Sequence, residues 1–148
     1  MFNIINKIFN MISFILAEKS IKSEDLVAFE KKFELILPER YKEHMLKFNG
    51  GFPDKDYYKG VNIAHFNPIK YGDDTLEHNI LDLQDVLPVG YLPFAYDLGG
   101  NQICMDLNEG ENYGKVYYLP MDMGDIRSEF LSDSFEIFLN GLSEENDY

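Results

Sequence analysis

Three histidines and a single cysteine are the side chains of this 148-residue sequence best suited to chemistry. His44, His65 and His78 could in principle gather around a metal ion, but no two of them stand at the close spacing of a ligand pair. We therefore interpret them as ordinary, partly exposed histidines. Cys104 lies in an apolar run with no neighbouring motif, and is most simply a small packing residue.

Carboxylate pairs and paired glycines are the other candidates for a catalytic or nucleotide-binding site. Asp73 and Asp74 could be drawn into a glycosidase mechanism, yet any sequence this acidic contains such pairs by chance. Gly99 and Gly100 match neither a dinucleotide fingerprint nor a P-loop, because the spacing and the following helix are missing. We predict no catalytic residue, no metal and no cofactor, and hence a protein that is not an enzyme.

The formal net charge of −13 is unevenly distributed along the sequence. Residues 1–50 contain eight Lys or Arg against seven Asp or Glu, residues 51–108 three against nine, and residues 109–148 two against ten. Such a negative field repels nucleic acid and anionic membranes, so we expect neither as a partner. It attracts a basic protein and speeds the encounter with it. The alternative is that the acidity only keeps the protein soluble.

The first twenty residues predict an amphipathic helix. Their polar residues recur at helical intervals, which leaves Ile5, Phe9, Ile12 and Leu16 in one apolar stripe. A secretory leader would be apolar all round, and no segment approaches the roughly 20 apolar residues that span a bilayer. The single cysteine excludes an internal disulfide and suits a reducing compartment. We therefore expect a cytoplasmic protein whose first helix packs on the domain or forms a homodimer with a second copy.

Beyond residue 20 the apolar pattern is first helical and then alternating. Helical spacing predicts a helix over 23–33, with Ser23 as its N-cap, and a second over 38–48, ended by Gly50 or Gly51.

Alternating or short apolar blocks at 61–66, 92–107 and 114–120 predict antiparallel strands, with turns at 97–101 and 108–114. The segment 67–88 is either a short helix or irregular. Ser132 or Ser134 caps a closing helix.

These elements predict one α+β domain: a mostly antiparallel sheet of about five to six strands with N-terminal and C-terminal helices packed against it. We divide the sequence into an extra amphipathic helix over 1–20, the domain itself over 21–142, and a frayed acidic tail over 143–148.

Three stretches resemble motifs of one known family. ILPERYKEHMLKFNGGF, from Ile36, is similar to the leucine-proline, helix, asparagine-glycine-glycine signature of the SUKH superfamily, whose best-known members are the Smi/Knr-type regulators. LPFAYDLGGNQICMDLNEGENYGKVYYLPMD, from Leu92, resembles its central hairpin, and SFEIFLNGL, from Ser134, its terminal helix. The resemblance extends from Ser23 to about Leu142. It assigns structural roles in the core and at turns to Leu37, Pro38, Asn49, Gly50, Gly51, Pro93, Phe94, Gly99, Gly100 and Gly114.

The resemblance implies a protein-binding module without catalytic activity. Bacterial members are typically immunity proteins, so the leading hypothesis is neutralisation of a basic, nuclease-like toxin domain of a contact-dependent or polymorphic toxin system. The alternatives are a Smi/Knr-like regulatory module without a toxin partner, and a small-molecule or sugar-binding domain that uses the tyrosine-rich sheet. Because the acidic excess begins after Gly51, the candidate partner-binding residues are Asp97, Asp106, Glu109, Glu111, Tyr113, Asp122 and Asp125, with Tyr117 and Tyr118 as further aromatic anchors.

Overall fold

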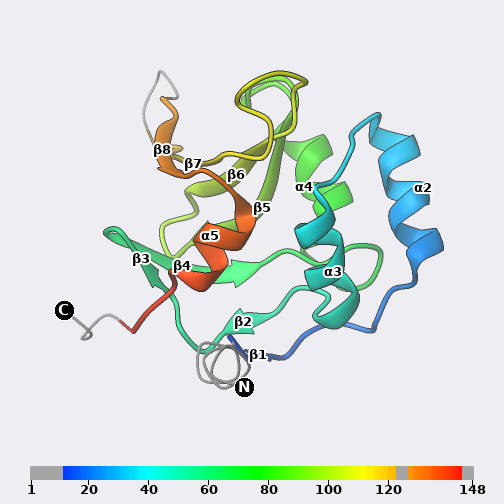
Figure 1. Ribbon diagram of the computed structural model, residues 1–148, viewed down its shortest axis with the longest axis horizontal. Helices are drawn as coiled ribbons and strands as arrows, with labels where there is room; N and C mark the ends of the chain where they lie inside the picture. The colour runs from blue at the N-terminus through cyan, green and yellow to red at the C-terminus, as the bar shows by residue number, and fades with distance from the viewer. Residues whose placement is uncertain (1–11, 123–126, 145–148) are drawn as a thin grey trace, which may run out of the picture.

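The computed structural model describes residues 12–122 and 127–144. Six strands, β3 to β8, form an antiparallel sheet in sequential order, and β1 pairs separately with β2 (Figure 1). This arrangement confirms the predicted α+β class and the mostly antiparallel sheet. The elements, in chain order, are β1 (Phe14–Ile15), α2 (Ser23–Phe33), α3 (Glu39–Lys47), β2 (Phe52–Pro53), β3 (Tyr57–Tyr58), β4 (Val61–Phe66), α4 (Leu76–Asp82), β5 (Tyr91–Asp97), β6 (Gln102–Asp106), β7 (Val116–Leu119), β8 (Glu129–Ser132) and α5 (Phe135–Asn140).

The sheet curls so far that its first and last strands meet. The Tyr58 hydroxyl on β3 donates to the carbonyl oxygen of Leu131 on β8 at 3.2 Å, and Lys59 Nζ donates to the same oxygen at 3.1 Å. On the other side of β3, Ser143 and Tyr57 exchange two backbone hydrogen bonds of 2.9 Å. Ser143 is therefore not part of a frayed tail as predicted, and residues 145–148 of that tail lie outside the described residues.

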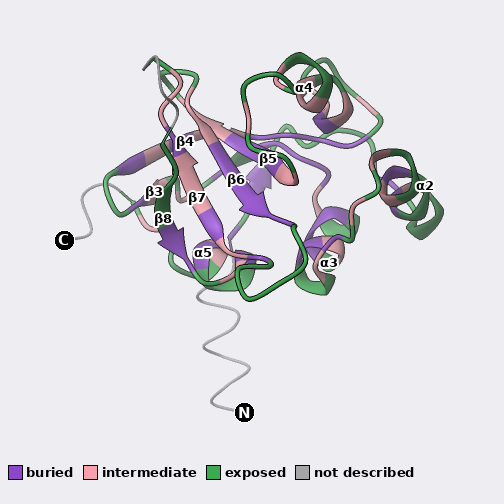
Figure 2. Cartoon of the chain, turned by 90° about the horizontal axis from the view of Figure 1, so that it is seen from above, coloured by how far each residue is buried: buried purple, intermediate pink, exposed green. Residues whose placement is uncertain are grey.

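The core lies between the sheet and the helices α3 and α5. Phe94 on β5 packs against Tyr41 of α3 and against Phe135 and Phe138 of α5, with ring centroids 5.5 to 6.2 Å apart. Buried residues are concentrated along β5 and β6, the two central strands (Figure 2). The ends of these two strands are consequently held by the best-packed part of the molecule.

The start of α2 differs by one residue from the prediction. Ser23 is the first helical residue, and the N-cap position belongs to Lys22. The backbone N–H of Lys22 donates to Asp25 Oδ2 at 2.9 Å, so the carboxylate of the first turn closes the helix end. The second helix begins at Glu39, directly after Pro38.

Gly50 and Gly51 do not cap α3 as predicted. The helix ends at Lys47, and Phe48 is already extended. The two glycines take φ of 75° and 109° at a point where three backbones come together. A Cβ on Gly50 would lie 2.9 Å from the carbonyl oxygen of Phe66, and one on Gly51 2.8 Å from that of Ile15. The glycines are needed for positive φ and for this close approach.

The predicted helix over residues 1–20 is wrong for the part that the structure describes. Phe14–Ile15 is a strand that pairs with Phe52–Pro53, and the Phe14 ring packs between the rings of His44 and Phe66. Tertiary packing of Phe14 thus overrides the helical spacing of its segment. Residues 1–11 lie outside the described residues, so the predicted homodimer through this segment stays a prediction.

Most other elements agree with the sequence. The hairpin of β5 and β6 turns at 98–101, the chain reverses again before β7, and Ser134 caps α5 by accepting from the backbone N–H of Ile137. The uncertain segment contains the short helix α4, capped by Thr75. Within the described residues, no helix is both long enough and apolar enough to cross a membrane.

Candidate functional site

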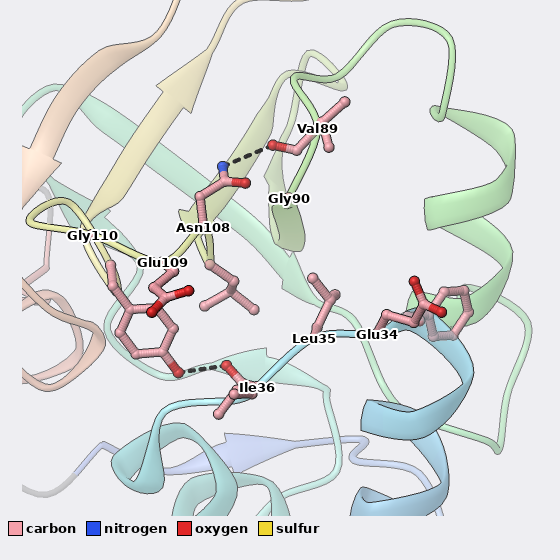
Figure 3. A pocket seen from close by; sticks show the side chains of 11 residues that line it. Glu34, Leu35, Ile36, Val89, Gly90, Asn108, Glu109 and Gly110 are labelled. Carbon is pink, nitrogen blue, oxygen red and sulfur yellow. Dashed lines mark hydrogen bonds between the residues drawn. The ribbon is translucent and has the colours of Figure 1, made fainter.

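An open groove with a volume of about 810 Å³ lies where the β6–β7 loop meets the linker between α2 and α3 (Figure 3). Three segments far apart in the sequence form its walls, and they include two of the predicted contact residues, Glu109 and Tyr113. The lining residues are Phe33, Glu34, Leu35, Ile36, Val89, Gly90, Leu107, Asn108, Glu109, Gly110 and Tyr113.

The α2–α3 linker forms the first wall. At the end of α2, Glu34 adopts a left-handed backbone with φ of 54°, and the chain continues in an extended run. The backbone N–H of Leu37 donates to Glu30 Oε2 at 2.8 Å, and the Leu37 side chain is buried in the core. Because side chains alternate along an extended chain, the preceding Ile36 is left 72% exposed.

The turn that leads into β5 forms the second wall, and Asn108 holds it in place. Asn108 Nδ2 donates to the carbonyl oxygen of Val89 at 2.9 Å (Figure 3). The backbone N–H of Leu107 donates to the carbonyl oxygen of Gly90, also at 2.9 Å. Gly90 has φ of 82°, and a Cβ there would lie 2.3 Å from Asn108 Oδ1. Any larger residue at this position would therefore displace Asn108.

The β6–β7 loop forms the third wall, and Asp106 determines its shape. Asp106 is the last residue of β6 and is only 8% exposed. Its Oδ1 accepts from the backbone N–H of Asn108 at 2.9 Å and from Asn108 Nδ2 at 2.8 Å, as in an Asx turn. The structure thus places this predicted contact residue inside the loop, where its carboxylate organises the turn.

Tyr113 connects the loop to the linker. Its hydroxyl donates to the carbonyl oxygen of Ile36, while the residue as a whole remains 36% exposed. Burial, with a smaller contribution from the charge of Glu30, raises the pKa of this hydroxyl. The phenol therefore keeps its proton, and its hydrogen bond, at neutral pH and somewhat above.

The groove is negatively charged. Its lining contains the carboxylates of Glu34 and Glu109, and Glu111 is exposed on the same loop. Within the described ranges, none of these three carboxylates has an ion-pair or hydrogen-bond partner, and no Lys, Arg or His lines the groove. Cations also lie nearby: Lys32 Nζ is 5.4 Å from the centre of the Phe33 ring, and Lys115 Nζ donates to Asn112 Oδ1 at 3.1 Å on the loop. Lys42, near Tyr113, is paired with Glu30 and Glu39. The local balance stays acidic.

Two further predicted carboxylates, Asp97 and Asp122, lie at the opposite end of the central strands. Asp97 ends β5, and its carboxylate accepts from the backbone N–H groups of Gly99 and Asn101 at 3.0 and 2.9 Å. It also accepts from Asn101 Nδ2 at 3.2 Å and from the Tyr118 hydroxyl. Asp97 thus holds the β5–β6 turn together.

Asp122 lies near this turn, since the backbone N–H of Met121 donates to Asn101 Oδ1 at 2.7 Å. Its side chain is exposed. Asp125 lies outside the described residues.

The two tyrosines of β7 point to opposite faces of the sheet. Tyr117 lies on the face away from the core, where its ring stacks on Tyr91 and meets Phe130 edge-on, at 5.6 and 6.0 Å. Tyr118 packs partly against the core. Burial, followed by its hydrogen bond to Asp97, raises the pKa of Tyr118 to about 12. Of these two half-buried tyrosines, Tyr117 therefore faces away from the core and Tyr118 packs against it.

The three histidines occupy separate environments. His44 is buried among the rings of Phe14, Phe48, Phe66 and Phe135, and burial lowers its pKa to about 4. The expectation of a partly exposed histidine is wrong here.

His65 lies between the rings of Phe52 and Tyr96, and the exposed His78 has its Nε2 3.0 Å from Asp82. Across the described residues, no group of three or more His, Cys, Asp or Glu could hold a metal ion. Cys104 is a buried free thiol, and burial raises its pKa.

Asn49, in the family motif, links three segments. It is buried, its Nδ2 donates to the carbonyl oxygens of Lys19 and Ile69 at 2.9 Å, and its Oδ1 accepts from the backbone N–H of Ile69 at 2.8 Å. The other motif residues besides Gly50 and Gly51 lie in the core, at turns or directly before α3: Leu37, Pro38, Pro93, Phe94, Gly99, Gly100 and Gly114.

The sequence analysis missed the apolar part of the groove, chiefly Ile36 and Val89. One signal was present: residues 35–37 are three consecutive apolar residues in a linker, and an extended chain cannot bury all three on one side. Val89 has no comparable signal, because a single valine before a glycine is common in turns that are merely exposed.

Comparison with curated proteins gives no match to this sequence. The model of the SMI1 / KNR4 family (SUKH-1) matches residues 20–141. This span begins just before α2 and ends just after α5, so it contains the six-stranded sheet and all three walls of the groove, while β1 lies outside it. Because the match covers most of the sequence and all of its central elements, the chain belongs to the SMI1 / KNR4 family (SUKH-1).

Proposed function

We propose that this protein is a cytoplasmic immunity protein that binds a basic, nuclease-like toxin domain and neutralises it by stoichiometric binding. The family resemblance implies such a role for bacterial members. The observation that carries the proposal is the β6–β7 loop, on which Glu109 and Glu111 are exposed beside Tyr113 and have no partner in residues 12–122 and 127–144. A toxin that acts on nucleic acid presents Lys and Arg in its cleft, and unpaired carboxylates are suited to meet them.

The structure explains why these two carboxylates are available. Asp106 accepts hydrogen bonds from the backbone N–H and the side-chain amide of Asn108. The loop therefore keeps its shape without a hydrogen bond to Glu109 or Glu111. Both carboxylates can therefore pair with a partner at little cost to the fold.

Co-expression tests the proposal. Cells that make the toxin domain encoded beside this gene should survive when they also make this protein, and the two purified proteins should form a complex that weakens as salt is added. Death of cells that contain the wild-type protein would contradict the proposal and favour the Smi/Knr-like regulatory alternative.

Charge variants locate the contact. The double variant Glu109→Lys/Glu111→Lys should lose protection. Its matched control is Asp73→Lys/Asp85→Lys, which changes the net charge equally at exposed positions outside the groove lining and should still protect.

A further inference from the structure

The groove combines exposed apolar side chains with carboxylates. Val89 is 89% exposed and Ile36 is 72% exposed, on different walls of the same groove. In Figure 3 the Leu35 side chain rises from the linker into the space between Glu109 and Glu34. Isolated apolar residues are ordinary on protein surfaces, but a contiguous set beside charged groups is typical of an interaction site.

Hydrogen bonds between the walls hold the groove open in advance. The Tyr113 hydroxyl ties the loop to the linker at the Ile36 carbonyl, and Asn108 Nδ2 ties the loop to the β5 turn at the Val89 carbonyl. Leu107, buried at the start of the loop, adds a backbone bond to Gly90. A site organised in this way loses little conformational entropy when it binds.

The shape favours a protein segment as the occupant. A volume of about 810 Å³ exceeds the space that one side chain needs, and the exposure of Val89 and Ile36 shows that the walls do not enclose their contents. Small-molecule sites usually bury about 70–90% of their ligand. An open groove of this size instead suits a few consecutive residues of a loop.

The carboxylates of the groove favour a basic segment as its occupant. Glu34 and Glu109 flank the apolar centre, and neither has a partner among the described residues. A second copy of this chain is a poor occupant, because the net charge of −13 makes two copies repel each other. Basic side chains on either side of an apolar one complement this pattern.

We infer that the groove is the anchor site for a toxin loop in which one or two large apolar side chains are flanked by Lys or Arg. The apolar side chains pack on Leu35, Ile36 and Val89, and the flanking cations pair with Glu34 and Glu109. The identity of the partner rests on the proposed function, whereas the preference for basic-apolar segments is a property of the groove alone.

Peptide titration tests this preference on the full-length, ¹⁵N-labelled protein by NMR. Three capped peptides are compared: Gly-Arg-Leu-Phe-Lys-Gly, the same peptide with Ser-Ser in place of Leu-Phe, and Gly-Glu-Leu-Phe-Glu-Gly. The first should shift the backbone amide signals of Ile36, Val89 and the loop 108–113. The other two should bind at least about tenfold more weakly. The inference is overturned if the first peptide shifts no groove amide, or if the serine peptide binds equally well.

Two matched variants sharpen the test. Val89→Lys places a cation in the groove, and Leu98→Lys places one at a residue that is 84% exposed, at the opposite end of β5. Val89→Lys should weaken binding of the first peptide at least about tenfold, and Leu98→Lys should weaken it by less than about twofold. Equal effects would show that only net charge matters, which would also overturn the inference.

The two proposals fail in distinguishable ways. If co-expression shows protection but the peptide does not bind in the groove, the inference is wrong and the proposed function stands. If the peptide binds as described but the toxin still kills, the groove inference stands for its ligand class and the proposed function is wrong.

Discussion

The two ends of the central strands both carry acidic residues, but the protein uses them in opposite ways. At the turn end, Asp97 accepts hydrogen bonds from two backbone N–H groups, the Asn101 amide and the Tyr118 hydroxyl. At the groove end, Asp106 likewise accepts hydrogen bonds that hold its loop, but Glu109 and Glu111 have no partner among the described residues. Both ends therefore hold a turn with an aspartate, and the groove end differs in presenting two further carboxylates on its loop to solvent.

The comparison shows what decides the role of a carboxylate here. Asp97 and Asp106 are the last residues of β5 and β6, where the free N–H groups of a turn lie within reach of a short side chain. The glutamates stand in the middle of a longer loop, whose two ends are held by Asp106 and by backbone hydrogen bonds from Tyr113, Gly114 and Lys115. Because β6 has 5 residues, the two ends lie roughly 15–17 Å apart, which separates the predicted contact residues into two groups.

The largest effect should come from removing the carboxylate at the turn end. Asp97→Ala leaves the donors of Gly99, Asn101 and Tyr118 without their acceptor, so we expect a loss of about 3–4 kcal/mol in the free energy of unfolding. Urea denaturation measures it. Asp122→Ala, at an exposed neighbour, is the control and should change stability by less than about 0.5 kcal/mol. Equal, small losses for both would show that the Asp97 carboxylate does not hold the turn together.

Acid should destabilise the fold through the buried His44. Burial lowers the pKa of His44 from 6.5 to about 4 in the folded protein. Between these values the unfolded chain binds a proton that the folded protein does not. The contribution of neutral His44 to the free energy of unfolding is therefore fully present above pH 6.5. It falls as the pH drops toward about 4, by about 3 kcal/mol in all.

A variant that lacks His44 checks this prediction. In His44→Phe the phenyl ring would join Phe14, Phe66 and the other rings of the cluster, and the pH dependence across the same window should shrink. Urea denaturation of both proteins at neutral pH and near the lower limit gives the comparison. An unchanged pH dependence would mean that other groups cause the loss.

A smaller effect is expected on partner binding from single charges at each end. Glu109→Lys should weaken the toxin complex at least about tenfold, whereas Asp122→Lys should weaken it by less than about threefold, with thermal stability nearly unchanged in both. Calorimetric titration at two salt concentrations measures the affinities. If Asp122→Lys is the more harmful change, the turn end is the contact surface.

The smallest effect should come from the bond that closes the groove. Tyr113→Phe removes the hydroxyl that donates to the Ile36 carbonyl, which should cost about 0.5–1.5 kcal/mol of stability. Tyr117→Phe is a matched control, because no hydrogen bond of the Tyr117 hydroxyl is found among the described residues. Hydrogen exchange of the linker amides should rise only in Tyr113→Phe. Equal exchange in both variants would show that the bond does not hold the linker.

The sequence by itself determined the family, the α+β class and most of the elements. The helix over 23–33, the β5–β6 hairpin and the closing helix follow from apolar periodicity and from turn or cap residues, which act within a few positions along the chain. The excess of acid after Gly51 is likewise present in the composition.

Only the tertiary structure decided which carboxylates are available and where a partner can anchor. Phe14–Ile15 is a strand because it pairs with Phe52–Pro53. Since this partner lies far along the chain, local spacing does not predict the pairing. Folding likewise brings residues 33–36, 89–90 and the loop 107–113 together around the groove. No local sequence pattern predicts that these segments lie close together. Asp97 and Glu109 look alike in the sequence, since each is an acid beside a glycine-containing turn. They differ because hydrogen bonds made on folding occupy one carboxylate and leave the other in solvent.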